Sequence, residues 1–226
     1  MTMENKLPNA FFAGAGTVGT GEYNAVTCSG SAKITGDIKC NSFSCAGSAK
    51  AAGDIVCGEM MKISGSFSSN GCVKAKELRV SGATRFLKSV EATQLHIAGS
   101  FRAEENVSAE KAVIRGAASI SGLLNAETVD ILFERGEGSE IGAIGGGTVI
   151  IKCKASSGFR KIFKKNVAKF KVGEIEADSV ELEQVAAKTV RAMNAVIGDG
   201  CEIGVLEYSD TLNVSENAKI GEIVKK

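Results

Sequence analysis

The residues of this chain that could do chemistry are seven cysteines, a lone histidine and two aspartates that each follow a glycine and lie seventeen residues apart. Cysteines in close C-x-x-C pairs, or joined by histidine, bind zinc, and paired cysteines form disulfides. Stacked carboxylates can act as general acid and base or bind Ca²⁺. Each of these chemistries needs its residues on neighbouring elements, so their spacing decides which one applies.

The spacing of the cysteines indicates a sequence repeat. Cys28 and Cys45 lie seventeen residues apart, as do Cys40 and Cys57, and the equivalent positions elsewhere carry Ile, Val or Ala. We interpret them as small buried apolar side chains, and we predict no metal site, no disulfide and no cofactor. Free thiols, and a polar start before the repeats that does not resemble an export signal, predict a cytoplasmic protein.

A glycine recurs along most of the N-terminal half, at intervals of 17, 18, 17, 17 and 17 residues. The glycines are Gly30, Gly47, Gly65, Gly82, Gly99 and Gly116. Apolar residues stand four and two residues before each glycine, eight and ten after it and, more loosely, two and four after it. Each pair has the i, i+2 spacing of a strand with one buried face.

Three such pairs in seventeen residues predict three short strands per turn of a triangular coil. Coils stacked about 4.8 Å apart pair their strands in parallel. The sequence therefore predicts an all-β fold, a parallel β-helix with about 17 residues per turn. One proline and 27 glycines agree with uninterrupted strands and many corners. The net charge of +1 indicates no nucleic-acid or acidic-polymer partner.

The period divides the chain into four parts. We predict a loosely ordered N-terminal segment over 1–21, regular turns over 22–134, an irregular and basic insertion over 135–171, and C-terminal turns over 172–226. In the last part a seventeen-residue offset aligns two sets of residues. They are Val180, Ile197 and Val214, and Ala186, Ile203 and Ile220.

The insertion carries the most distinctive surface chemistry. Residues 158–171 contain six basic residues and no acidic one, and the phenylalanines fall on one side of a helical wheel. A basic amphipathic helix suits the anionic inner face of a membrane. The alternative is a loop that packs on the solenoid with its lysines in solvent or paired with acidic residues downstream. The candidate docking residues are Phe159, Arg160, Lys161, Phe163, Lys164, Lys165, Lys169 and Phe170.

Catalysis has little support in the residues. Asp37 and Asp54 share one repeat position after a glycine, where aspartate is a common turn residue, and His96 is expected to face solvent. The row 197–204, IGDGCEIG, invites comparison with hexapeptide acyltransferases, which use a longer, left-handed coil and usually a catalytic histidine. No Walker-type phosphate loop occurs. We predict no catalytic residue, and a β-helix enzyme that modifies sugars or acyl groups is the alternative.

Rows of about seventeen residues with short non-repetitive ends resemble the bactofilins, a family of bacterial polymer-forming cytoskeletal proteins. The pattern covers roughly residues 22–134 and 170–224, and the passage from Lys169 to Lys226 is similar to the longer Gram-positive members. The resemblance implies a right-handed β-helix that polymerises end to end without nucleotide. It also implies a scaffold for cell-wall enzymes, cell shape or motility machinery, often at the membrane. The insertion departs from the family's uninterrupted helix.

Physics favours assembly as well, because the last turn of a solenoid exposes unpaired backbone groups and core side chains. Contacts between unlike ends do not close and give a filament. The candidate end residues are Phe11, Phe12, Ile220 and Ile223. The expected partners are further copies of the chain or a paralogue, the inner membrane face, and cell-wall or motility proteins, but not nucleic acid. The alternative is that residues 1–21 fold back over one end.

Overall fold

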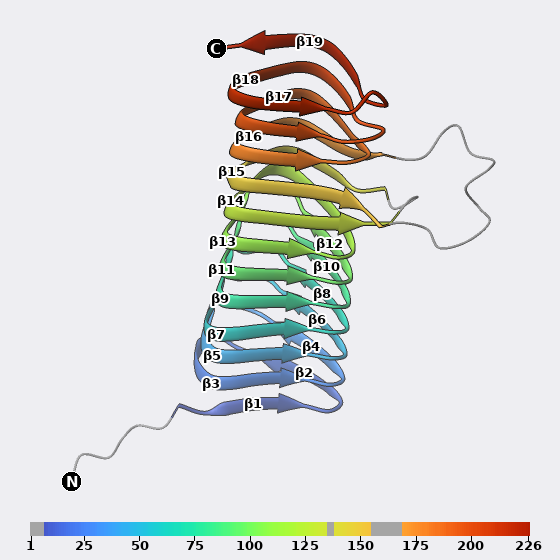
Figure 1. The fold of residues 1–226 in the computed structure, drawn as a ribbon. Helices are drawn as coiled ribbons and strands as arrows, with labels where there is room; N and C mark the ends of the chain where they lie inside the picture. The colour runs from blue at the N-terminus through green and yellow to red at the C-terminus, as the bar shows by residue number, and fades with distance from the viewer. Residues whose placement is uncertain (1–6, 135–137, 155–168) are drawn as a thin grey trace, which may run out of the picture.

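The computed structural model describes residues 7–134, 138–154 and 169–226, and every regular element in these ranges is a β-strand. The predicted parallel β-helix is confirmed, since the strands stack into a solenoid of about 12 turns with roughly 17 residues per turn (Figure 1). The first strands are β1 (Asn9–Phe12), β2 (Ala15–Val18), β3 (Gly21–Cys28), β4 (Ser31–Ile34), β5 (Ile38–Cys45), β6 (Ser48–Ala51), β7 (Ile55–Ile63), β8 (Ser66–Ser69), β9 (Val73–Val80) and β10 (Ala83–Phe86). The others are β11 (Val90–Ile97), β12 (Ser100–Ala103), β13 (Val107–Ile114), β14 (Ala117–Phe133), β15 (Glu140–Cys153), β16 (Phe170–Leu182), β17 (Val185–Ile197), β18 (Glu202–Val214) and β19 (Lys219–Lys225).

Each regular turn has three faces. Face A is the four-residue strand of a turn, such as β4, β6, β8, β10 or β12. The longer strand that follows bends at a corner, and its two parts form faces B and C. The bend of β7 holds one residue more than that of β5, since Cys40 pairs with Cys57 whereas Ser42 pairs with Met60. This extra residue explains the single 18-residue interval between glycines.

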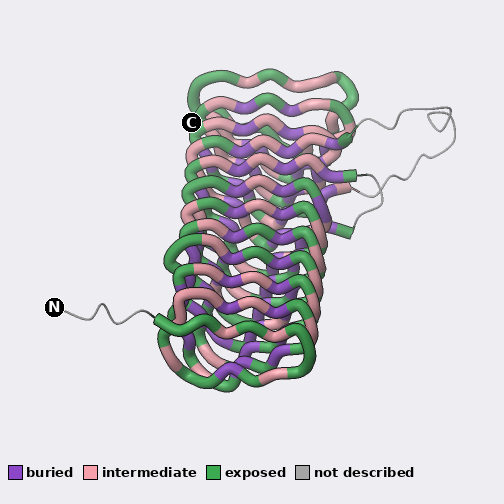
Figure 2. The backbone as a smooth tube through the Cα atoms, turned by 90° about the horizontal axis from the view of Figure 1, so that it is seen from below, coloured by how far each residue is buried: buried purple, intermediate pink, exposed green. Residues whose placement is uncertain are grey.

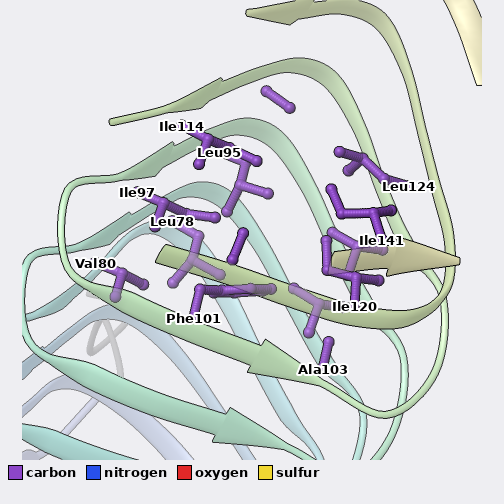
Figure 3. Packing of buried hydrophobic residues seen from close by; sticks show 14 of the residues in the cluster. Leu78, Val80, Leu95, Ile97, Phe101, Ala103, Ile114, Ile120, Leu124 and Ile141 are labelled. Atoms are coloured by element: carbon purple, nitrogen blue, oxygen red, sulfur yellow. The ribbon is translucent and has the colours of Figure 1, made fainter. Parts of the chain in front are cut away.

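The predicted apolar columns line the interior, where buried residues alternate with exposed or half-buried ones along the inner turns (Figure 2) and pack against one another (Figure 3). On face C, Ile97 is 1% exposed and lies in register between Val80 and Ile114. On face A, the rings of Phe67, Phe86 and Phe101 stack with centroids 5.9 and 5.2 Å apart. No single turn could bury these side chains alone, so the core exists only through stacking.

The recurring glycines are needed for close approach rather than for an unusual backbone angle. A Cβ on Gly82 would lie 1.9 Å from the carbonyl oxygen of Gly65 one turn below, and one on Gly65 would lie 1.9 Å from that of Gly47. Among the glycines of the described residues, only Gly21 and Gly200 have a positive φ. The corner between faces C and A therefore stacks so tightly that it leaves no room for a side chain.

The prediction of a loosely ordered segment over 1–21 is wrong for the part that the structure describes. β1 pairs with β3 from Asn9 to Phe12, and β2 pairs with β4. These strands have only four residues each, and β2 has Gly16 at an inward position where most later turns have Ala or Phe, which hid their period. They form the first turn of the solenoid.

The prediction of one continuous insertion over 135–171 is also wrong. Residues 140–153 form β15, a full turn that pairs with β14 below and β16 above. Gly146 lies within this strand, and a Cβ there would be 1.9 Å from the carbonyl oxygen of Ala126. The glycine-rich sequence thus reflects close stacking of β15 on β14. The basic stretch 155–168 lies outside the described residues.

The alignment predicted for the C-terminal turns is confirmed for Ile197 with Val214 and for Ile203 with Ile220, but the first member of each set is wrong. Val180 pairs with Ala195 rather than Ile197, because Leu182 and Ile197 are register partners at an offset of fifteen residues. Ile203 pairs with Ala187 rather than Ala186. Two corners of this turn are each one residue shorter than in the N-terminal turns, which moves the offset without disturbing the inward pairs.

Candidate functional site

The two ends of the solenoid are the candidate site, because strands there have a neighbour on one side only. At the lower end β1 and β2 pair upward with β3 and β4, and at the upper end β19 pairs downward with β18. The outer edges of these strands pair with no other strand among the described residues. Such an edge is a template for a further strand.

Phe11 and Phe12 were both predicted for the lower end, and they differ there in how far their rings are buried. Phe12 packs against the buried core, and a Cβ on Gly16 would lie 1.8 Å from its Cδ1 atom, so the ring lies against the inner side of Gly16. Phe11 is 67% exposed. The lower end is therefore partly capped by Phe12, while Phe11 offers an apolar ring to solvent.

Ile220 and Ile223, predicted for the upper end, lie in β19 in register with the buried Ile203 and Leu206 of the turn below. Ile220 is partly buried against the core, and Ile223 is 50% exposed. Both continue apolar columns that run up from below. The upper end thus exposes part of the core.

Two further apolar residues belong to this end but were not among the predicted end residues, although the sequence had aligned one of them, Val214, with Ile197. Leu212 and Val214 of β18 lie above Ala195 and Ile197 and are only partly buried. Their offset of seventeen residues from these partners was the available signal. With the two isoleucines they make the upper end a four-residue apolar surface, which we call the upper apolar surface.

Ion pairs hold the last turns to those below. The Oε2 atom of Glu207 lies 2.5 Å from Lys226 Nζ, and the Oε1 atom of Glu202 lies 2.7 Å from Lys169 Nζ. These lysines lower the pKa values of Glu207 and Glu202 below the usual carboxyl range. All four side chains reach solvent, so each pair contributes little on its own.

Acid is therefore expected to loosen the upper turns first. Hydrogen bonds from Ser215 and Asn217 also lower the pKa of Asp199, so three carboxylates of this end have folded pKa values below their unfolded ones. Their contribution to stability is present above the unfolded pKa of about 4 and is lost as the pH falls through the folded value. Hydrogen exchange, corrected for intrinsic rates, should show β18 and β19 losing protection relative to β9 and β11 between pH 6 and pH 3. Equal loss in all four strands would contradict this.

Of the eight residues predicted to dock at a membrane, the structure describes only Lys169 and Phe170. Phe159, Arg160, Lys161, Phe163, Lys164 and Lys165 lie outside them. Phe170 is fully buried in β16, with its ring centroid 5.3 Å from that of Phe133, so its assignment as a membrane anchor is wrong. Lys169 is paired with Glu202. The helical wheel had placed Phe170 on the apolar side of an amphipathic helix. The i, i+2 spacing of Phe170 and Val172 indicates a strand instead.

The corner aspartates have a structural role. Asp37 Oδ1 accepts a hydrogen bond from the backbone N–H of Asp54 at 2.9 Å, and Asp54 Oδ1 accepts one from that of Cys72 at 2.8 Å. Each carboxylate thus fixes the corner one turn above, as the turn interpretation predicted. His96 is partly exposed on face C, 3.9 Å from a Glu77 carboxylate that already binds Arg79.

The cysteine columns are buried as predicted. Cys28, Cys40, Cys45 and Cys57 are all free thiols in the core. Burial and the neighbouring Cys28 raise the pKa of Cys45 to about 12, and contact with Cys57 together with burial raises that of Cys40. A thiol whose pKa is raised in this way, as at Cys40 and Cys45, is a poor nucleophile. In the described ranges, no group of three or more His, Cys, Asp or Glu residues is placed to hold a metal ion.

Comparison with known proteins finds two relatives, both from Bacillus subtilis (strain 168). The chain is 33% identical to the uncharacterized protein YhbF over 104 residues, which is 46% of this chain and 42% of YhbF. It is 34% identical to the uncharacterized protein YhbE over 102 residues, or 45% of this chain and 42% of YhbE. The match thus spans less than half of each relative. No family model and no solved structure matches the chain.

Among the described residues, no helix is long and apolar enough to cross a bilayer.

Proposed function

We propose that this chain is a bactofilin-like structural protein, not an enzyme, whose solenoids stack end to end into filaments without nucleotide. The filaments would serve as a cytoplasmic scaffold for cell-wall enzymes, cell shape or motility machinery. The observation that carries the proposal is the upper apolar surface beside the unpaired edge of β19. The resemblance to bactofilins agrees with it.

The physical argument rests on what a second copy would cover. Stacking an end turn on β19 would pair its outer N–H and C=O groups and bury Ile223, which is 50% exposed. Burial of apolar area contributes about 25 cal/mol per Å². The lower end offers a complementary set, with the open edges of β1 and β2 and the exposed ring of Phe11.

The test is self-assembly of the purified full chain in the absence of ATP and GTP. We expect elongated particles in electron micrographs and concentration-dependent sedimentation over a wide range of salt. Replacing Ile220 and Ile223 by serine should abolish the long particles and raise the protein concentration needed for assembly at least about tenfold, because each buried side chain contributes roughly 1.5–3 kcal/mol. Central turns should stay folded, since solenoid contacts are nearest-neighbour.

A matched control removes two apolar side chains from the side of the solenoid that are exposed to about the same extent as Ile223. Met193 and Val196 are 49% and 45% exposed on β17, so M193S/V196S changes surface hydrophobicity without touching an end. This variant should assemble like the parent chain. A parent chain that stays monomeric at every concentration and salt, or a control that loses assembly to the same extent, would refute end-to-end stacking.

Attachment to the inner membrane face stays a separate prediction. It depends on the basic stretch 155–168, of which the structure describes nothing.

A further inference from the structure

Face A of the N-terminal half presents two parallel columns of side chains to solvent. The first column, at the start of each short strand, is Ser31, Ser48, Ser66, Ala83, Ser100 and Ala117. The second, two residues on, is Lys33, Lys50, Ser68, Arg85, Arg102 and Ser119. We call the second the basic column. Neither column contains an acidic, aromatic or large apolar residue.

The cations of the basic column are stacked on like charges and are mostly unpaired. Lys33 is the register partner of Lys50, and Arg85 that of Arg102. Like charges directly opposite each other on adjacent strands are destabilising. Within the described ranges only Arg85 of these four forms an ion pair, with Glu104 at 3.2 Å.

Elsewhere on the molecule, residues at equivalent positions of neighbouring turns carry opposite charges and form ion pairs. On face B, Lys74 Nζ lies 2.7 Å from Glu91 of the next turn, and Lys39 lies 3.7 Å from Glu22. In the upper part of face A, Glu202 takes the position of the basic column and pairs with Lys219 at 3.7 Å. Three of the four cations of the basic column, on β4, β6 and β12, thus lie in one line along the solenoid without an ion pair among the described residues, an arrangement that the net charge of +1 hides.

The basic column borders a shallow groove. The groove has a volume of about 550 Å³ and is lined by the basic side chains Lys50, Arg85 and Arg102 and by Ser66, Ser68 and Ser100, among others. Serine hydroxyls and guanidinium groups both donate hydrogen bonds to phosphate oxygens, and arginine does so in a bidentate manner. The groove follows the solenoid axis because its lining residues come from successive turns.

We propose that this face binds a linear, phosphate-bearing polymer laid along the solenoid axis. Four turns separate Lys33 from Arg102, or about 19 Å at the usual strand spacing, so a single phosphate could engage only a fraction of the column. The face lacks the aromatic side chains on which nucleic-acid bases stack. It also lacks the apolar side chains that anchor a protein in a bilayer. A flexible polymer without bases fits it best.

The test measures binding of the full chain to fluorescently labelled long-chain inorganic polyphosphate at low and moderate salt. The column variant K50S/R85S/R102S puts serine where Ser68 and Ser119 already occupy the same register position, so it should fold normally. We expect its affinity to fall at least about tenfold, with a shallower dependence of log Kd on log salt, because fewer counterions are displaced. Orthophosphate at equal total phosphate should not compete.

The matched control removes three exposed cations from the other faces, as K62S/K76S/K111S. None of the three forms an ion pair within the described ranges, and the net charge changes by the same amount. The control should bind polyphosphate like the parent chain. Equal losses in both variants would show that binding follows overall charge and would overturn the proposal.

Other outcomes are equally decisive. No binding by the parent chain would overturn the proposal, and so would tighter binding, sensitive to the column variant, to single-stranded DNA or to phosphatidylglycerol vesicles. Because the basic column lies on the side of the solenoid, the column variant should assemble like the parent chain. Failure of this proposal is thereby separate from failure of end-to-end stacking.

Discussion

An aspartate in place of Ile97 is expected to lower the free energy of unfolding by roughly 4 kcal/mol or more. Ile97 is 1% exposed and packs in register between Val80 and Ile114, so the carboxylate would find apolar neighbours on both sides. The site offers no cation to pair with it. Chemical denaturation followed by circular dichroism would measure the loss.

The control is the same substitution three residues later. Ser100 is exposed at the start of β12, and S100D should change stability by no more than about 0.5 kcal/mol. Burial raises the pKa of an aspartate, so the cost of I97D should shrink as the pH falls and the carboxyl is neutralised. Equal stability of the two variants at pH 7 would mean that Ile97 does not face the interior.

Most of the fold could be predicted from the sequence because the regular turns repeat one spacing of apolar pairs and glycine. Inward pairs such as Leu95 and Ile97 occur at fixed distances from a glycine, and stacking places identical positions on top of each other. The period alone was therefore enough to assign the strands and buried columns from β3 to Ile131 of β14, but not the turns that contain β1, β2 and β15. In the C-terminal turns the residues two beyond Leu182 and Ile197 are Gln184 and Asp199 rather than glycine, so this marker was absent and the offset of fifteen between Leu182 and Ile197 was missed.

The candidate site was less predictable, for two physical reasons. One apolar residue can fit both the i, i+2 pattern of a strand and one side of a helical wheel. Phe170 fits both patterns, and its burial in β16 shows that the strand pattern applies. Charge was the second difficulty, since composition averages it over the chain. The cations Lys33, Lys50, Arg85 and Arg102 are far apart in sequence, and only the register of β4, β6, β10 and β12 brings them into one column.

Alanine at Gly82 is expected to cost about 3 kcal/mol, although it adds a single methyl group. Its Cβ would lie 1.9 Å from the carbonyl oxygen of Gly65 and 2.6 Å from that of Ser64. These atoms belong to the backbone, and the N–H of Gly82 reaches down to the carbonyl oxygen of Ile63, so the corner cannot move without lengthening that hydrogen bond. The expected result is a lower denaturation midpoint.

Gly58 provides the matched control, because a Cβ there would meet its nearest neighbour, Asn41 Oδ1, only at 3.7 Å. G58A should be neutral or slightly stabilising, since alanine restricts the unfolded chain. If G82A and G58A denature at the same midpoint, the glycine column does not set the separation of the turns. If only G82A is destabilised, the glycine period marks close stacking, and a glycine in this column is required by the turn beneath it rather than by its own backbone angle.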